Sequence, residues 1–314
     1  MQAIQGSIIM DEIGQPLVSI CSAVYNHEPY LRECFEGFVM QKTTFAFEVL
    51  VHDDASTDGS ADIIREYTAK YPEIFKPIYQ QENQYSKGIK VSATYQYPRA
   101  KGKYIAFCEG DDYWTDPLKL QKQVDFLEAN PDYVVCSHHF DLYDESTKTF
   151  KPDWFKHIEE DFEYDLASFV TRKAWMTQPL TVLYRSKAWD QSEYKQYNNA
   201  KDVTLFYYLL RKGKGMLLKD NMGIYRIHSE GIWSKVDKGK QTKAEMLTAM
   251  GVYDVHKDRS SAMLLANSAY RFPGIEFFKE NGELYRRALK IIYKELGIKW
   301  WWKFIKKTCN PNRK

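Results

Sequence analysis

A short apolar segment that ends in a cluster of acids constrains this chain more than any other feature. Residues 104–107 read YIAF, and after one cysteine the letters EGDD follow at residues 109–112. Open α/β sheets bind ligands at the carboxyl ends of buried strands, so this segment would bring carboxylates to a ligand-binding edge. Crowded carboxylates repel one another and lose hydration, which costs free energy. A bound Mg²⁺ or Mn²⁺ ion would offset that cost, and such an ion often holds a phosphate as well. Taken alone, the segment fits equally well an acidic turn in which Asp116 caps the next helix.

Segments of strand and helix character alternate from residue 17 to about residue 140. The helix expected after Asp116-Pro117 has an acid at its N-cap and a proline in its first turn, and its apolar residues recur at helical spacing. Repeated strand–helix units predict an α/β fold, with a mixed, mostly parallel sheet and helices on both faces. Strands are expected at residues 17–25, 47–51, 74–79, 104–107 and 133–136, and helices at residues 29–40, from Ser60, and at 91–99.

A second group of acids strengthens the interpretation of a ligand-binding edge. The expected strand at residues 47–51 is followed by His52, Asp53 and Asp54. Parallel strands of one sheet end at the same edge, so two pairs of acids would converge there. This convergence favours a site for a metal ion and a nucleotide over an isolated acidic turn.

Composition limits the class of protein. The 314 residues are 44% hydrophobic and 27% charged, which is ordinary for a soluble globular protein, and a net charge of +2 gives no electrostatic case for a nucleic-acid partner. No apolar run approaches the roughly 18 residues of a membrane span, and no signal peptide is recognisable at the N-terminus. The five cysteines have no metal-ligand spacing. We therefore expect a cytoplasmic protein with reduced thiols.

Three motifs in the alternating half resemble those of family 2 glycosyltransferases. They are the strand that leads into Tyr25-Asn26, the segment VHDDASTDGS at residues 51–60, and CEGDD at residues 108–112, which is similar to the metal-binding D-x-D motif of that family. Their order and separation match over about the first 140 residues. The resemblance implies a GT-A fold and metal-dependent, inverting transfer of a sugar from a nucleotide diphosphate sugar. A glycan or lipid-linked acceptor and a role in building surface polysaccharide are also implied.

The resemblance also divides the chain. Beyond about residue 141 the pattern changes to short strands and aromatic loops, and from Gln241 onward it is helical. The expected regions are an N-terminal tail at 1–15, a nucleotide-sugar-binding half at 16–140, an acceptor-binding half at 141–240 and a helical region at 241–314.

Several residues carry over to the donor site from the family. Ala23 and Tyr25 would line the pocket for the base, and Asp54 would hydrogen-bond the base. Lys87 is proposed from its own surroundings and not from the family: it lies in a polar loop, where it would neutralise phosphate or, equally well, remain solvated. His228 would contact the diphosphate or the metal, although a lone histidine is more often structural.

The acid cluster itself takes the positions of the D-x-D motif. Glu109 and Asp111 occupy its two acids, with Asp111 as the direct ligand of Mn²⁺ or Mg²⁺. Asp112 would support the ribose, the metal or the acceptor. Glu109 departs from the family, which has aspartate there, and its longer side chain would reach a ribose hydroxyl or act on the metal through water.

Inversion requires a base on the face opposite the leaving group, away from the metal. Asp202, at the start of an expected helix in the second half, is the candidate, and an ordinary helix N-cap is the alternative. Asp190 and Glu193 are weaker candidates.

The C-terminal segment at residues 298–307 reads IKWWWKFIKK. If it is helical, one face carries Ile298, Trp301, Trp302 and Ile305, and another face carries lysines. This pattern suits an interfacial helix on an anionic bilayer, which would place the protein on the inner face of the cell membrane. A helix docked on the catalytic domain with a solvated basic edge also fits.

Two other functions are compatible with an acid cluster. A sugar-phosphate nucleotidyltransferase would also use carboxylates and a metal, but it usually has a glycine-rich phosphate loop, and residues 17–26 contain no glycine. A non-catalytic module that binds glycans or membranes is the second alternative. Nucleotide-sugar binding with and without Mn²⁺ separates these functions.

Overall fold

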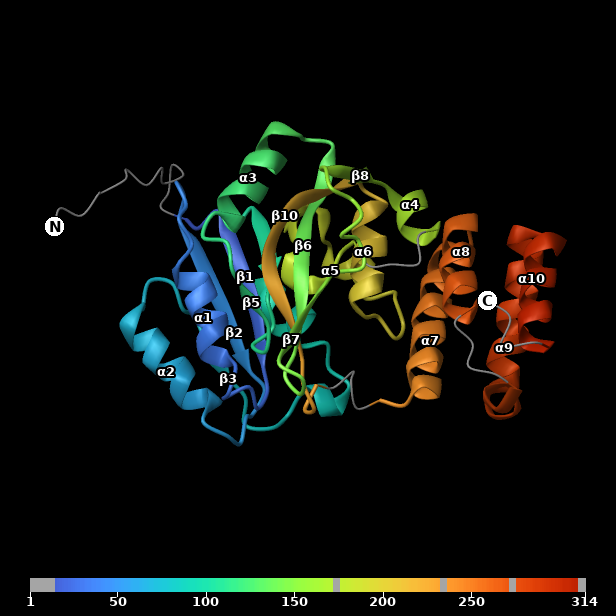
Figure 1. Ribbon diagram of the computed structural model, residues 1–314, viewed down its shortest axis with the longest axis horizontal. Coiled ribbons are helices and arrows are strands. Elements are labelled where there is room, and N and C mark those ends of the chain that lie inside the picture. Colours follow the sequence, from blue (N-terminus) through green and yellow to red (C-terminus); the bar gives the residue numbers. More distant parts are fainter. Residues whose placement is uncertain (1–14, 172–175, 232–235, 271–274, 310–314) are drawn as a thin grey trace. The chain divides into compact units, whose positions relative to one another are not determined.

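The computed structural model of the chain describes residues 15–171, 176–231, 236–270 and 275–309 (Figure 1). The expected N-terminal tail, up to residue 14, lies outside the described residues. The chain divides into two compact units, and each is assembled from three separate stretches of sequence. The first unit comprises Met1–Glu163, Met176–Trp189 and Gly213–Ile227, and the second comprises Tyr164–Trp175, Asp190–Lys212 and His228–Lys314.

A ten-stranded mixed sheet forms from the described strands, in the order β3-β2-β1-β4-β9-β6-β10-β5, with β7 paired to β6 and β8 to β10. The strands are β1 (Val18–Val24), β2 (Phe47–Asp53), β3 (Ile78–Tyr79), β4 (Tyr104–Phe107), β5 (Tyr113–Trp114), β6 (Tyr133–Asp144), β7 (Thr149–Pro152), β8 (Phe162–Tyr164), β9 (Leu183–Arg185) and β10 (Lys214–Ile227).

The parallel part of the sheet contains the strands that the sequence marks most clearly. β1 lies between β2 and β4 and runs parallel to both. Most side chains of β1 are buried on either face, as expected for an interior strand that is covered on both sides. β9 then pairs antiparallel with both β4 and β6, and β10 runs parallel to β6. The predicted α/β class and its mixed sheet are confirmed.

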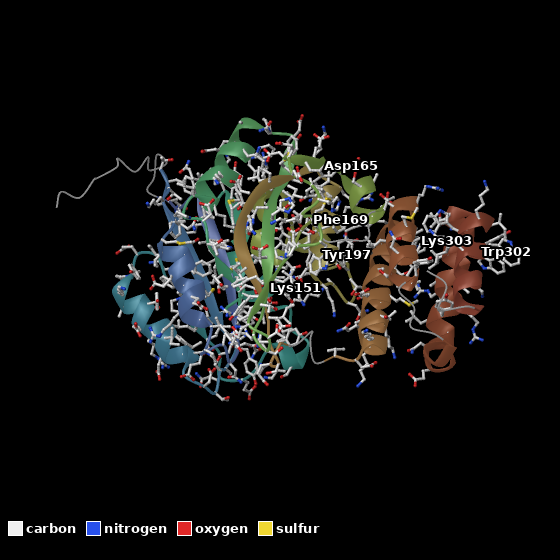
Figure 2. All side chains as sticks on the ribbon, in the orientation of Figure 1. Lys151, Asp165, Phe169, Tyr197, Trp302 and Lys303 are labelled. Atoms are coloured by element: carbon white, nitrogen blue, oxygen red, sulfur yellow. The ribbon has the colours of Figure 1, made fainter. Side chains whose placement is uncertain are left out.

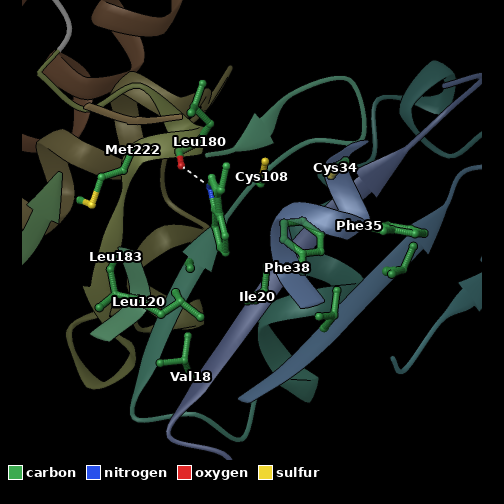
Figure 3. Close-up of a cluster of buried hydrophobic side chains, with 14 of the residues drawn as sticks. Val18, Ile20, Cys34, Phe35, Phe38, Cys108, Leu120, Leu180, Leu183 and Met222 are labelled. Atoms are coloured by element: carbon green, nitrogen blue, oxygen red, sulfur yellow. Dashed lines mark hydrogen bonds between the residues drawn. The ribbon is translucent and has the colours of Figure 1, made fainter. Parts of the chain in front are cut away.

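Helices of the first unit pack on this sheet through aromatic side chains. Phe35 and Phe38 of α1 (Leu31–Val39) are fully buried in the apolar core (Figure 3). The Phe38 ring lies 5.0 Å from the Trp114 ring in an edge-on arrangement. Gly37 lets α1 approach the backbone of β5 closely, because a Cβ there would lie 2.9 Å from the main-chain nitrogen of Trp114. The helices of this unit are α1 (Leu31–Val39), α2 (Ser60–Lys70) and α3 (Lys119–Ala129), with short turns η1 (Tyr85–Lys87), η2 (Ser92–Gln96), η3 (Tyr97–Arg99), η4 (Pro179–Thr181) and η5 (Ser186–Ala188).

The second unit is helical in its described parts. The predicted helical region begins at Lys238, close to the expected Gln241, and its described parts consist of four helices. No helix in the described ranges is both long and apolar enough to cross a membrane. The helices are α4 (Leu166–Thr171), α5 (Gln191–Tyr194), α6 (Asp202–Leu210), α7 (Lys238–His256), α8 (Arg259–Tyr270), α9 (Ile275–Leu296) and α10 (Ile298–Cys309).

Two local predictions were wrong in detail. The helix expected at 91–99 is a π-helical turn, η2, followed by the 3₁₀ turn η3. Asp116 is not the N-cap of α3, because Leu118 holds that position. The Asp116 carboxylate instead accepts a hydrogen bond from the Leu118 N–H (2.7 Å), so it orders the turn before the helix.

Candidate functional site

The carboxyl ends of β2, β1 and β4 lie side by side, and hydrogen bonds join the loops that follow them. The register pairs Val24 of β1 with Asp53 of β2. Beyond the strands, the Asp54 N–H donates to the Val24 carbonyl (2.9 Å), and the Gly110 N–H donates to the Ala23 carbonyl (3.0 Å). The two acid-bearing segments therefore flank β1 at one edge of the sheet, the edge at which open α/β sheets bind ligands.

The loop after β1 is fastened to the loop after β2. Asn26 has a φ of 55°, a left-handed conformation that asparagine tolerates better than most residues. Its Oδ1 accepts from the Thr57 N–H (2.7 Å), and its own N–H donates to the Ser56 hydroxyl (3.0 Å). The His27 N–H donates to the Ser60 hydroxyl at the start of α2 (2.9 Å). This edge is thus held by side chains of the segment DDASTDGS.

The acids after β4 lie on one tight turn, which we call the acid turn (residues 109–112). The Asp112 N–H donates to the Glu109 carbonyl (3.1 Å). Along the turn the side chains become more enclosed, since Glu109 is exposed, Asp111 is half-buried and Asp112 is buried. Gly110 allows the turn to lie close to its neighbours, because a Cβ there would lie 2.8 Å from Nδ1 of His27 and would force that side chain to move. Nε2 of the same histidine lies 3.8 Å from Oδ2 of Asp111.

Asp112 is held in an environment that disfavours its charge. Burial raises the pKa of its carboxyl well above the usual range, and the neighbouring charge of Asp111 raises it further. The main-chain N–H of Arg226, in β10, donates to Oδ1 of Asp112 (2.9 Å) and opposes that shift. A cation near the turn would stabilise the ionised forms of these acids.

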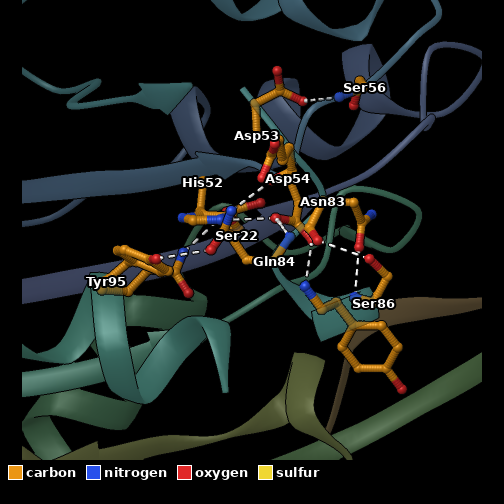
Figure 4. A network of polar contacts seen from close by, with 12 residues as sticks. Ser22, His52, Asp53, Asp54, Ser56, Asn83, Gln84, Ser86 and Tyr95 are labelled. Carbon is orange, nitrogen blue, oxygen red and sulfur yellow. Dashed lines mark hydrogen bonds and ion pairs between the residues drawn. The ribbon is translucent and has the colours of Figure 1, made fainter. Parts of the chain in front are cut away.

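Asp54 organises a loop at the same edge (Figure 4). Its Oδ1 accepts from the Gln84 N–H (2.8 Å), and its Oδ2 accepts from the Tyr85 N–H (3.0 Å). Nε2 of His52 lies 3.5 Å from Oδ1. Both oxygens of this buried carboxylate therefore hold the start of η1 in place. The hydrogen bond expected between Asp54 and a nucleotide base stays a prediction, and it would add a further partner to the same oxygens.

The π-helical turn η2 supplies two further residues of this edge that the sequence did not reveal. The Tyr95 hydroxyl donates to Oε1 of Gln84 (3.1 Å). The amide of Gln96, which is fully buried, donates to the carbonyls of Ser22 (3.0 Å) in β1 and Leu50 (2.7 Å) in β2. No local pattern distinguishes Tyr95 and Gln96 from residues of an ordinary amphipathic helix, so their role at this edge could not be predicted from the sequence.

Other expected donor-site residues of the first unit lie nearby in the chain but differ in exposure. Ala23 is half-buried within β1, and Tyr25, directly after it, is 39% exposed. Lys87 is the last residue of η1, and its ammonium group pairs with the Glu82 carboxylate. The proposed contact of Lys87 with phosphate stays a prediction and would compete with that ion pair.

Asp202 and His228 belong to the second unit. Asp202 is the first residue of α6, is exposed, and does not cap the helix, because Lys201 holds the N-cap position with a non-helical backbone. Oγ1 of Thr204 accepts from the Lys201 N–H (3.2 Å) at this terminus. The interpretation of Asp202 as only an N-cap is therefore wrong. His228 is buried at the beginning of the last stretch of this unit.

The two weaker candidates for a base are occupied by structural contacts. The Asp190 carboxylate caps α5, and the hydroxyl and main chain of Ser192 lower its pKa. Glu193 pairs with Lys212 (2.7 Å) and accepts from the Tyr208 hydroxyl (2.6 Å), and these partners lower its pKa. A carboxylate with a lowered pKa is a poorer proton acceptor, so both are less suited to this task than Asp202.

The acid turn fits a cation whose coordination sphere is completed by a bound substrate. Within the described residues, no three His, Cys, Asp or Glu side chains are grouped so that they would hold an ion by themselves. Mg²⁺ in nucleotide sites is commonly held by one or two carboxylates together with substrate phosphates. Asp111, with Glu109 exposed on the same turn, supplies a donor set of that size.

Comparison with known proteins identifies relatives across much of the chain. The model of the family described as glycosyl transferase family 2 matches residues 19–191. An uncharacterized protein of Mycobacterium tuberculosis is 38% identical over 226 residues, which are 69% of this chain and 60% of that protein. The chain thus spans less than two thirds of this relative. A relative named "putative teichuronic acid biosynthesis glycosyltransferase TuaG", from Bacillus subtilis, is 30% identical over 200 residues, or 63% of this chain and 74% of its own length.

Solved structures with a similar fold extend over more of the chain. TarS of S. aureus, in complex with UDP-GlcNAc, has a TM-score of 0.63 at 20% identity and covers 88% of this chain and 80% of its own. The mannosyltransferase PcManGT of Pyrobaculum calidifontis, in complex with GDP-Man and Mn2+, has a TM-score of 0.54 at 12% identity, with 95% and 88% covered. At these identities the likeness concerns the fold.

Proposed function

The chain belongs to glycosyl transferase family 2, and on that premise we infer that it transfers a sugar from a nucleotide diphosphate sugar to a hydroxyl of a glycan or lipid-linked acceptor in polysaccharide synthesis. The GT-A fold expected from the sequence is confirmed by the structural neighbours. One observation carries the proposed activity: the loop of Asp54 and the acid turn flank β1 at the ligand-binding edge, within the family-matched residues.

The acid turn is the proposed site of the cation and the diphosphate. A divalent cation there would neutralise the charge that develops on the leaving diphosphate. Asp111 would be its direct ligand, and Glu109 would reach the ribose or a water on the cation. The complex of PcManGT with GDP-Man and Mn2+ supports this assignment by analogy of fold.

Inversion at the sugar carbon would require a general base away from the cation, and we propose Asp202 for this role. As the general base it would take the proton from the acceptor hydroxyl while that oxygen attacks from the face opposite the diphosphate. Its position at the exposed first turn of α6, outside the N-cap, and the raised pKa that desolvation gives its carboxyl support this task. The structural engagement of Asp190 and Glu193 supports the choice of Asp202 over them.

The C-terminal helix is the proposed contact with a membrane that carries the acceptor. α10 is helical, as expected, and carries Trp302 and Lys303 (Figure 2). Ile298 and Trp302 are 49% and 51% exposed. Nζ of Lys303 lies 4.7 Å from the centroid of the Trp300 ring, so cationic and aromatic groups adjoin on this helix. The side chains of Ile305 and Lys306 lie outside the described residues. Exposed aromatic and basic groups of this kind favour an interfacial location on anionic lipid.

Calorimetric titration with UDP and GDP, each with and without Mn²⁺, tests the proposed activity most directly. We expect one nucleotide to bind at least about tenfold more tightly with Mn²⁺, since a cation held by the acid turn would also attract the diphosphate. The enzyme should then release the nucleoside diphosphate from the matching nucleotide sugar slowly when water accepts the sugar, and rapidly when a glycan acceptor is present. Cation-independent binding, or binding with neither nucleotide, would count against a metal-dependent glycosyltransferase and favour a non-catalytic module.

A further inference from the structure

The acid turn is held by an arginine from a distant strand. We propose that Arg226 is the positioning residue of the acid turn, which fixes the direction in which Asp111 and Asp112 present their carboxylates to a cation and a nucleotide diphosphate. This role rests on the proposed function and refines it, because it names the group that makes the turn a preorganised cation site. Arg226 lies in β10, 115 residues beyond Asp111 in the sequence.

Arg226 contacts two successive residues of the acid turn in two different ways. Its side-chain Nε donates to the carbonyl oxygen of Asp111 (2.9 Å), and its main-chain N–H donates to Oδ1 of Asp112 (2.9 Å). Neither bond uses the carboxylate of Asp111. The main chain at Asp111 and the side chain of Asp112 are thereby fixed to the same residue of the sheet.

The guanidinium of Arg226 is itself held rigidly. Its Nη1 pairs with Glu145, in the turn after β6, and its Nη2 lies 2.5 Å from Glu33 of α1. The guanidinium carbon lies 4.9 Å from the centroid of the Tyr30 ring and 5.0 Å from that of the Tyr113 ring. Only 4% of the Arg226 side chain is exposed. A buried charge is tolerated when it is paired and hydrogen-bonded, and these contacts meet that condition.

This arrangement explains why the residue is an arginine. A planar guanidinium donates in three directions at once, here toward a carbonyl oxygen and two carboxylates, whereas a lysine ammonium lacks this fixed fork. Residues that do not bind a metal but hydrogen-bond its ligands and orient them matter for affinity: mutating such a residue typically weakens metal binding by roughly 10- to 100-fold. Arg226 supports the acid turn in this way, through hydrogen bonds to the main-chain carbonyl of Asp111 and to the buried carboxylate of Asp112.

The test measures cation affinity separately from nucleotide affinity. Arg226→Lys and Arg226→Gln are titrated with UDP or GDP, whichever binds the wild type, in the absence of cation, and then with Mn²⁺ in the presence of that nucleotide. We expect about tenfold weaker Mn²⁺ affinity in both variants, with nucleotide affinity in the absence of cation unchanged. Arg32→Gln is the matched control, since it removes an exposed arginine that pairs with Glu66 (2.7 Å), and its Mn²⁺ affinity should equal that of the wild type.

Each outcome decides between the two proposals. If the wild type shows no cation-dependent binding, the proposed function and the role of Arg226 both fail. If the wild type responds to Mn²⁺ and Arg226→Gln or Arg226→Lys responds equally, only the positioning role is wrong. If circular dichroism shows that neither variant folds, Glu145→Gln is used instead, because it changes a partner of the Arg226 guanidinium. A weaker Mn²⁺ response in Glu145→Gln supports the positioning role of Arg226, and an unchanged response overturns it.

Discussion

The ammonium nitrogen of Lys119 lies 3.9 Å from the centroid of the Trp114 ring, and both side chains are buried in the first unit. Lys119 also donates to Oε1 of Gln123 (2.8 Å). Lysine is almost never fully buried unless it is paired, so this cation between α3 and β5 is unusual. Burial lowers the pKa of Lys119 to about 7, which makes the stability of the protein sensitive to pH between that value and the ordinary pKa of lysine.

Stability should therefore rise with pH above neutrality because of Lys119. Between its folded pKa of about 7 and its unfolded value near 10.5, the unfolded chain binds the additional proton. Relative to Lys119→Met, the free energy of unfolding of the wild type should increase by up to about 1.4 kcal/mol per pH unit from pH 7.5 to 9. Urea titrations across this range measure it. Lys122→Met, on the same helix, is the control, because ion pairs raise the pKa of Lys122 and keep its titration above this range. Parallel pH profiles for wild type and Lys119→Met would show that the amine is not buried as described.

Loss of the Asp54 carboxylate should release the loop that it holds. In Asp54→Ala, the N–H groups of Gln84 and Tyr85 lose their acceptors, so their hydrogen exchange should accelerate by about tenfold or more. Hydrogen–deuterium exchange mass spectrometry over η1 measures this change. Asp62→Ala, which removes an exposed acid of α2 paired with Arg65, should leave the exchange of η1 unchanged. Equal protection of η1 in Asp54→Ala would mean that another group orders this loop.

Removing the charge of Asp111 should separate cation binding from nucleotide binding. Asp111→Asn keeps the size of the side chain, and we expect it to lose the Mn²⁺-dependent part of nucleotide affinity, about tenfold or more, while binding without cation persists. Calorimetric titration measures the nucleotide affinity both with and without Mn²⁺. Asp116→Asn, at an acid just beyond the turn that pairs with Lys122, should behave like the wild type. A full Mn²⁺ response in Asp111→Asn would move the cation site elsewhere.

The base assignment predicts a defect confined to the chemical step. Asp202→Asn should lower kcat by roughly 10²- to 10⁴-fold, since an amide cannot accept the hydroxyl proton, and should leave nucleotide affinity intact. Release of nucleotide diphosphate with a glycan acceptor reports kcat. Glu193→Gln should retain most of the activity, because that residue is engaged by Lys212. If Asp202→Asn turned over at nearly the wild-type rate, the base would have to be another residue.

Membrane contact by α10 should depend on its exposed aromatic residue and on salt. Deletion of residues 297–314 should abolish co-sedimentation with vesicles that contain anionic lipid, and Trp302→Ser should weaken it. High salt should weaken it too, because the attraction between lysines and lipid is screened. Trp154→Ser changes a tryptophan of the first unit with similar exposure, 52% against 51%, and should have no effect. Unchanged binding after the deletion would exclude this segment as the contact.

The sequence alone was sufficient for the framework of the candidate site. The strands around Val18–Val24 and Phe47–Asp53 and the acids that follow β2 and β4 were predictable, because the burial pattern of a strand and the residues just beyond its end are local properties. The family resemblance then assigned tasks to those acids, and the matched family model covers the same residues.

Only the tertiary structure revealed what surrounds those acids. Arg226 reaches Glu33 across 193 positions, and Asp54 holds Gln84 and Tyr85 in a loop 30 residues or more away. The insertion of β9 between β4 and β6 and the burial of Lys119 under Trp114 are equally invisible in local patterns. These contacts depend on which strands become neighbours and which side chains fill the space between them. Sequence periodicity encodes the face of an element that is buried, but not the partners it meets there.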